Sequence, residues 1–212
     1  MNDSYSNPFM NTFTKVVDTL VLSILWLVCS LPVFTVGAAS GALYYAYHKT
    51  IRQDRSYPVK TFFKAFRSNF SQATAIWMLV LVFGGMSAFA CYCLYALRGS
   101  FPAAGVLLAI GVEIIIFLAV WCLYLFAYQA RFENRMVAIM ANSAVLVVAN
   151  LHWSLLLLAM FAAVVLMVLW KPVMFAPAAA VFIWAENRIL ERVFRKIMTE
   201  EMLLSEAEAD QA

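Results

Sequence analysis

The chain has 212 residues, of which 65% are hydrophobic and only 13% are charged, and its mean hydropathy is +0.83. Soluble globular domains have about half apolar and about a quarter charged residues, so this composition excludes a soluble domain. Seventeen Phe, nine Tyr and six Trp exclude a disordered chain, because disordered chains lack the apolar surface that offsets the entropy of ordering. The sequence therefore predicts an all-α integral membrane protein, a polytopic bundle of transmembrane helices.

Stretches without charge define the predicted membrane crossings. The hydrocarbon core of a bilayer is about 30 Å thick and a helix rises about 1.5 Å per residue, so about 20 apolar residues suffice to cross it. On this basis the sequence predicts five crossings, the last of them short and partly interfacial: Val17 to Ala39, Ala73 to Leu97, Ala103 to Tyr128, Ala149 to Trp170, and Val173 to Arg192. The uncharged segment from Met136 to Asn150 is predicted to be a tilted or interfacial helix that leads into the fourth crossing.

A helix break is predicted inside the first crossing. Pro32 cannot donate an intrahelical hydrogen bond, and Gly37 and Gly41 are expected to loosen the helix that follows. The break leaves two alternatives open. Either the segment crosses once, or a helix that ends at Leu31 turns and a second helix, Ala38 to Ile51, returns to the starting side, which gives six membrane segments.

The basic residues predict the orientation. All fifteen Lys and Arg lie in connections, and placing the long basic loop inside puts twelve of them in the cytoplasm and three outside, or thirteen and two with six segments. The positive-inside rule therefore predicts a multi-pass protein of the cell membrane with a cytoplasmic C-terminus, while the side of the N-terminus stays open. Residues 1–198 are predicted to form one helical domain, and the acidic residues 199–212 a frayed tail.

The basic loop contains an amphipathic pattern. Aromatic residues recur at steps of three and four, and basic residues take the other face, which predicts an interfacial helix along the inner leaflet. Two roles stay open for it, namely lipid contact and the docking of a partner protein. The residues that would carry either role are Phe62, Phe63, Lys64, Phe66, Arg67, Asn69 and Phe70.

A second amphipathic pattern follows the fifth crossing. Its basic face holds Arg188, Arg192, Arg195 and Lys196. Its apolar stripe consists of Ile189, Leu190, Val193, Phe194, Ile197 and Met198. The pattern predicts a helix that extends the fifth crossing out along the membrane surface.

Glu113 is an ionisable residue near the middle of the third crossing. An ionised group there costs about 2.5 to 3.5 kcal/mol, so its charge must be compensated. Two interpretations stay open: a neutral carboxyl that is hydrogen-bonded to a neighbouring helix, or a proton or substrate contact on a polar path. The candidate partners are Asn142, Ser143, Asn150 and His152.

The sequence favours no enzymatic activity and no cofactor. It has no His-Glu-x-x-His, no phosphate-binding glycine loop and no Gly-x-Ser-x-Gly, and it contains only two His. Its four Cys lie in apolar segments, where free Cys acts as a small hydrophobic residue, so no metal site is predicted. The basic loop is too short to indicate nucleic-acid binding.

Several motifs carry a resemblance to a known family. They are Leu31-Pro32-Val33-Phe34-Thr35-Val36-Gly37-Ala38, Ala42-Leu43-Tyr44, Phe62-Phe63-Lys64-Ala65-Phe66-Arg67-Ser68-Asn69-Phe70, Arg131-Phe132-Glu133-Asn134, Asn142, and Asn150-Leu151. In these the chain resembles the YesL family of bacterial integral membrane proteins over nearly its whole length. The resemblance implies relatives that occur mainly in Gram-positive bacteria, often beside genes for carbohydrate uptake and polysaccharide utilisation. That family has no assigned activity, so the resemblance implies no catalytic or binding residue.

Together these observations predict a non-enzymatic accessory protein whose partners are membrane lipids and the subunits of a carbohydrate transport system. The rival hypothesis is a small transporter in which Glu113 and the bend from Pro32 to Gly37 line a substrate path, as broken helices do in known carriers. An intramembrane enzyme would need a second ionisable group near Glu113.

Overall fold

The structure is a computed structural model that describes residues 8–52, 57–99, 103–132 and 134–198. All regular structure in these residues is helical, which confirms the predicted all-α class. The α-helices are α1 (Pro8–Ser30), α2 (Val36–Ala46), α3 (Pro58–Ala96), α4 (Ala104–Arg131), α5 (Met136–Ala149), α6 (Leu151–Trp170) and α7 (Phe175–Phe194). Shorter turns are η1 (Val33–Thr35), the π-helical η2 (Tyr47–Arg52) and η3 (Pro172–Met174).

Four helices are long and apolar enough to cross a bilayer: Thr12–Ser30 of α1, α3, α4 and α6. They overlap the first four predicted crossings, and α4 and α6 begin and end within three residues of the predicted bounds. The chain therefore has the architecture of a multi-pass membrane protein. The helix predicted between the third and fourth crossings is α5, which has 14 residues and spans about 21 Å, too short to cross.

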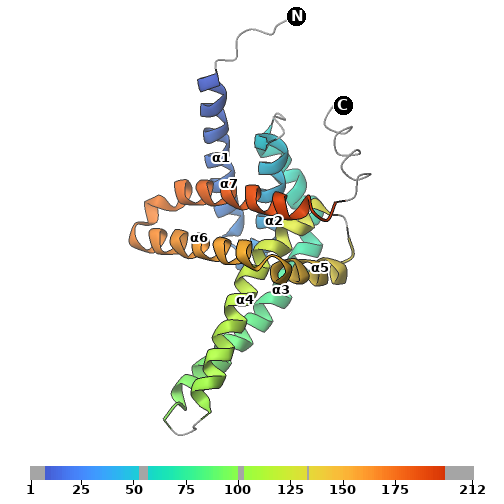
Figure 1. The fold of residues 1–212 in the computed structure, drawn as a ribbon. Helices are drawn as coiled ribbons and strands as arrows, with labels where there is room; N and C mark the ends of the chain where they lie inside the picture. The colour runs from blue at the N-terminus through green and yellow to red at the C-terminus, as the bar shows by residue number, and fades with distance from the viewer. Residues whose placement is uncertain (1–7, 53–56, 100–102, 133, 199–212) are drawn as a thin grey trace, which may run out of the picture.

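The chain reverses direction after α1. Helix α1 ends at Ser30, and the hydroxyl of Thr35 donates to the carbonyl oxygens of Cys29 and Pro32 at 2.5 and 2.6 Å, which closes the turn through η1. Helix α2 then runs back beside α1 (Figure 1). As a result Lys15 near the start of α1 and Tyr47 after the end of α2 line the same groove. The structure thus has the hairpin of the six-segment alternative at this point, not a single pass from Val17 to Ala39.

The two glycines after the break have a different role from the one predicted. Gly37 and Gly41 lie inside α2, which continues through both of them, so they do not loosen the helix. A Cβ atom on Gly37 would lie 2.7 Å from Cβ of Trp77 and 2.8 Å from the ring of Phe126. Gly37 therefore permits the close approach of α2 to α3 and α4, as small residues do between membrane helices.

Helix α3 is continuous over 39 residues, about 60 Å, which is twice the thickness of the hydrocarbon core. The Phe-rich segment predicted to lie along the inner leaflet is the first third of this helix. The segment is therefore continuous with the spanning part of α3 and is not a separate helix, and its position relative to the inner leaflet stays a prediction. Phe62 is fully buried, whereas Phe63, the next residue around the helix, is 45% exposed.

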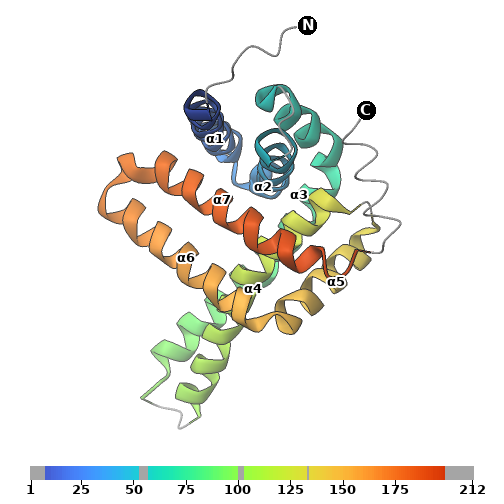
Figure 2. The same cartoon turned by 45° about the horizontal axis from the view of Figure 1, so that its top comes forward.

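The far halves of α3 and α4 form a separate two-helix arm, residues 81–96 and 105–119. None of these residues is buried, and Figures 1 and 2 show the arm projecting from the rest of the molecule. Apart from Glu113, its large exposed side chains are hydrophobic, including Phe83 and Phe89. Such a surface is suited to lipid and not to water.

Helices α6 and α7 form a second hairpin, connected through η3, that runs across α4 and not alongside it (Figures 1 and 2). The predicted fifth crossing corresponds to α7, but α7 is not among the four spanning candidates. The reason is that α7 carries four charged residues, Glu186, Arg188, Glu191 and Arg192. It buries the two glutamates against the other helices. Its apolar stripe is confirmed for Ile189, Leu190, Val193 and Phe194, which are buried, while Ile197 is exposed. The predicted acidic tail, 199–212, lies outside the described residues.

Candidate functional site

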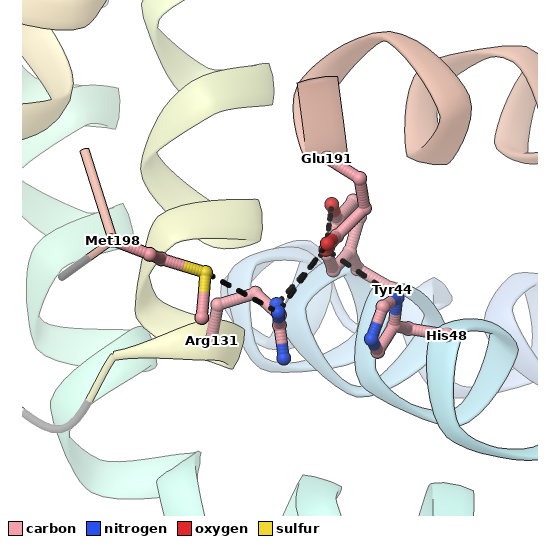
Figure 3. A network of polar contacts seen from close by, with 5 residues as sticks. All are labelled: Tyr44, His48, Arg131, Glu191 and Met198. Atoms are coloured by element: carbon pink, nitrogen blue, oxygen red, sulfur yellow. Dashed lines mark hydrogen bonds and ion pairs between the residues drawn. The ribbon is translucent and has the colours of Figure 1, made fainter. Parts of the chain in front are cut away.

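The most buried charged group in the described residues is the carboxylate of Glu191 on α7, which is 1% exposed. The Nε atom of Arg131, the last residue of α4, lies 2.9 Å from Oε1, and its Nη2 donates to Oε2 at 3.3 Å. The hydroxyl of Tyr44 on α2 donates to Oε1 at 3.0 Å, and Nδ1 of His48 in η2 lies 3.3 Å from the same oxygen. Figure 3 shows Glu191 reaching between these side chains, with Sδ of Met198 3.8 Å from Nη2 of Arg131. We call Tyr44, His48, Arg131 and Glu191 the Glu191 cluster.

Aromatic rings enclose the Glu191 cluster. Phe194, one turn after Glu191, packs edge-on against Tyr44, Tyr128 and Phe132, with centroids 6.4, 6.1 and 5.6 Å apart. The rings of Tyr128 and Phe132 lie 4.6 Å apart. These rings lower the local dielectric, which strengthens the attraction between Arg131 and Glu191.

The Glu191 cluster forms an interhelical contact. A forked guanidinium–carboxylate contact fixes orientation as well as distance, so it sets the position of α7 on the end of α4. Neither the groove between α1 and α7 nor the apolar hollow between α3 and α4 is lined by any of the four residues. The cluster therefore connects α2, α4 and α7, and no described cavity brings a substrate to it.

A second carboxyl group lies in the same helix. Glu186 is 8% exposed, and burial raises its pKa from 4.5 to about 8. Burial has this effect because the ionised form loses its hydration without gaining a cation. Glu186 is therefore mostly protonated at neutral pH, whereas Glu191 has Arg131 beside it.

Glu113 does not meet its predicted partners. It lies on the exposed surface of the arm, while Asn142 bonds to Tyr128, which is 15 residues, about 22 Å, further along α4. The proposed polar site of Glu113, Asn142, Asn150 and His152 is therefore not brought together by the fold.

The predicted partners of Glu113 have other roles. Nδ2 of Asn142 donates to the hydroxyl of Tyr128 at 3.0 Å, and Nε1 of Trp121 donates to the hydroxyl of Ser143 at 2.8 Å. These bonds connect α4 to α5. Asn150 is buried at the junction of α5 and α6, where its carbonyl oxygen accepts the backbone N–H of Ser154 at 3.0 Å.

The remaining predicted residue, His152, is exposed and lies against Trp153, with ring centroids 5.0 Å apart. Among the described residues no group of three or more His, Cys, Asp or Glu is placed to hold a metal ion.

The sequence did contain one signal of the Glu191 cluster that the predictions did not use. Two carboxylates, Glu186 and Glu191, fall inside the predicted fifth crossing, where each needs compensation. The identity of the compensating groups could not be deduced, because Arg131 and Tyr44 lie 60 and 147 positions away from Glu191.

Comparison with known proteins gives one match. A family model described as "Protein of unknown function, DUF624" matches residues 19–90, about a third of the chain. The matched region runs from α1 through the turn at Pro32 and α2 into the arm, and it includes the Phe-rich start of α3. The match supports a relationship to an uncharacterised family. No curated protein and no solved structure matches the chain.

Proposed function

We propose that this protein is a non-enzymatic accessory component of a membrane assembly, and that it docks its partner through the first third of α3. The observation that carries the proposal is the continuity of α3. Phe62 anchors the segment in the core, while Val59, Phe63 and the basic residues of the segment stay exposed on a continuous helix. We call the exposed residues Val59, Lys60, Phe63, Lys64 and Arg67 the α3 docking face.

The mixed character of the α3 docking face favours a protein partner over a lipid surface. An amphipathic helix binds the leaflet when its axis lies in the membrane plane, so that the apolar face is buried among the headgroups. In the first third of α3, Phe62 is buried against the other helices, and the exposed α3 docking face mixes Val59 and Phe63 with three basic residues, so it offers no separate apolar face to the lipid. Exposed aromatic and Arg side chains are enriched at the cores of protein interfaces.

The resemblance to YesL-like proteins supplies the proposed partner, a subunit of a carbohydrate transport system. We place the protein in the cell membrane with its C-terminus in the cytoplasm, because this orientation keeps most basic residues inside. The α3 docking face then lies on the cytoplasmic side. The carrier hypothesis gains no support from Glu113, which is exposed on the arm far from the other polar residues.

The proposal is tested by site-specific photocrosslinking in native membranes. A photoreactive residue at Phe63 is expected to capture a permease subunit, whereas the same probe at Tyr92, exposed on the arm, is expected to capture lipid. Lipid adducts alone at Phe63 would contradict docking. The substitution Lys64→Glu is expected to abolish co-purification with that subunit, and Arg98→Glu, at the other end of α3, is the matched control.

A transport assay separates the accessory role from the carrier. Solute flux into proteoliposomes that contain only this protein is expected to be absent. If the wild-type protein produced flux and Glu113→Gln abolished it, the result would overturn the proposal in favour of the carrier.

A further inference from the structure

A groove with a volume of about 660 Å³ lies in the angle between α1 and α7. Figure 1 shows the two helices crossing at this point. The volume is within the range of small-molecule sites, about 300 to 1,000 Å³. The lining residues used below are Lys15, Val16, Tyr47, Val181, Trp184 and Arg188.

The groove is positively charged. Among the described residues that line it, Lys15 and Arg188 are basic and none is acidic. The guanidinium of Arg188 lies 5.0 Å from the ring centroid of Trp184, which holds it at the groove wall. Glu186 is near in sequence but is buried in the core, and its raised pKa, about 8, leaves it mostly neutral at pH 7.

The rest of the lining suits an amphiphile. Val16 and Val181 lie on opposite walls of the groove and are more than half exposed. Next to Val16, Phe13 and Val17 continue the exposed apolar surface along α1. A ligand with an anionic head and an apolar tail would therefore place its charge between Lys15 and Arg188 and its tail along α1.

The groove is at the end of the molecule that the charge distribution assigns to the cytoplasm. Tyr47 forms part of its wall, and the basic loop begins two residues later at Lys49. The inner leaflet presents anionic phospholipids at that level. We propose that the groove binds the phosphate headgroup of an anionic membrane lipid, with Lys15 and Arg188 neutralising the phosphate and Val16 and Val181 contacting the start of the acyl chains.

The test is a lipid titration of the purified full-length protein, followed by native mass spectrometry and by tryptophan fluorescence. Phosphatidylglycerol is expected to bind in preference to phosphatidylcholine, and binding is expected to change the emission of Trp184, as identified with Trp184→Phe. Lys15→Gln and Arg188→Gln are each expected to weaken phosphatidylglycerol binding about fivefold, and the double variant more than tenfold. Lys15→Arg is expected to retain binding, which separates loss of charge from loss of fold.

Arg192→Gln is the matched control, because Arg192 is exposed on α7 one turn further along and does not line the groove. An equal loss of affinity in Arg192→Gln would overturn the proposal, since it would show diffuse surface attraction. Equal binding of the two lipids would also overturn it. Competition with glycerol 3-phosphate distinguishes the source of the phosphate: no displacement supports a lipid, and displacement at equal affinity overturns the lipid in favour of a soluble phosphate ester.

Discussion

Arg131 and Glu191 face each other across the contact between α4 and α7, and each of two guanidinium nitrogens lies within 3.3 Å of a different carboxylate oxygen. Both side chains are largely shielded from solvent, with 12% and 1% of their surface exposed. The pair fixes α7, which is not among the four helices that are long and apolar enough to cross a bilayer. Its effect on stability should therefore be large when only one partner is removed.

We expect Arg131→Met to lower the free energy of unfolding by about 3 to 5 kcal/mol, because it leaves the Glu191 carboxylate buried without its cation. Unfolding in detergent, followed by circular dichroism, measures the change. The double variant Arg131→Met/Glu191→Met removes both charges and is expected to recover most of the loss. A double variant no more stable than the single one would show that the contact does not hold α7.

The sequence predicts the spanning helices well, because length and absence of charge decide them locally. The bounds of α4 and α6 follow from where charged residues stop and start. Pro32 indicates where the first segment breaks, but the reversal of the chain there was one of two alternatives that the sequence left open. For α3, the alternation of Phe and basic residues was interpreted as a surface helix. The pattern indicates which face is apolar, but not whether the segment is a separate helix or is continuous with the crossing that follows.

The Glu191 cluster could not be predicted, for a different reason. Its residues come from α2, η2, α4 and α7, and no periodicity connects them. Glu113 was the more conspicuous acid because it lies in the middle of a charge-free stretch. The fold places it on the outside of the arm and selects two acids near the C-terminus for burial. Helix packing decides which polar groups come into contact, and a single sequence does not reveal that packing.

The contact of α2 with α3 and α4 depends on the absence of a side chain at Gly37. We expect Gly37→Ala to destabilise the protein, because the new Cβ would lie 2.7 Å from Cβ of Trp77, and that atom is next to the backbone and cannot move away cheaply. Gly84→Ala is the control: nothing lies within 4 Å of its Cβ position, and Ala is the better helix former by about 1 kcal/mol. In thermal unfolding in detergent, Gly37→Ala is therefore expected to lower the melting temperature and Gly84→Ala to raise it.

The buried carboxyl of Glu186 should make stability depend on pH. Its pKa is 4.5 when unfolded and about 8 when folded, so between these values the folded state binds more protons and stability falls as pH rises. The contribution is fully present below about pH 4.5 and lost by about pH 8. Glu186→Gln removes the ionisable group. The stability of the variant relative to the wild type is therefore expected to rise with pH across this window, by up to several kcal/mol. The measurement is the free energy of unfolding of both proteins at a series of pH values. If the two stabilities changed with pH in parallel, the result would contradict the burial of Glu186.

The arm can be tested by a crosslink within it. A Cβ on Gly111 of α4 would lie 2.5 Å from Sγ of Cys91 on α3, so a cysteine at position 111 is close enough to Cys91 to form a disulfide after a small local shift. In a background where the other three cysteines are serine, we expect Gly111→Cys to crosslink with Cys91 on mild oxidation, detected as the loss of two hydrogens in the intact mass. Gly105→Cys, whose Cβ has nothing within 4 Å, is expected to stay reduced. A crosslink in Gly105→Cys and none in Gly111→Cys would mean that α3 and α4 pair in a different register. Glu113 would then face a different side of the arm.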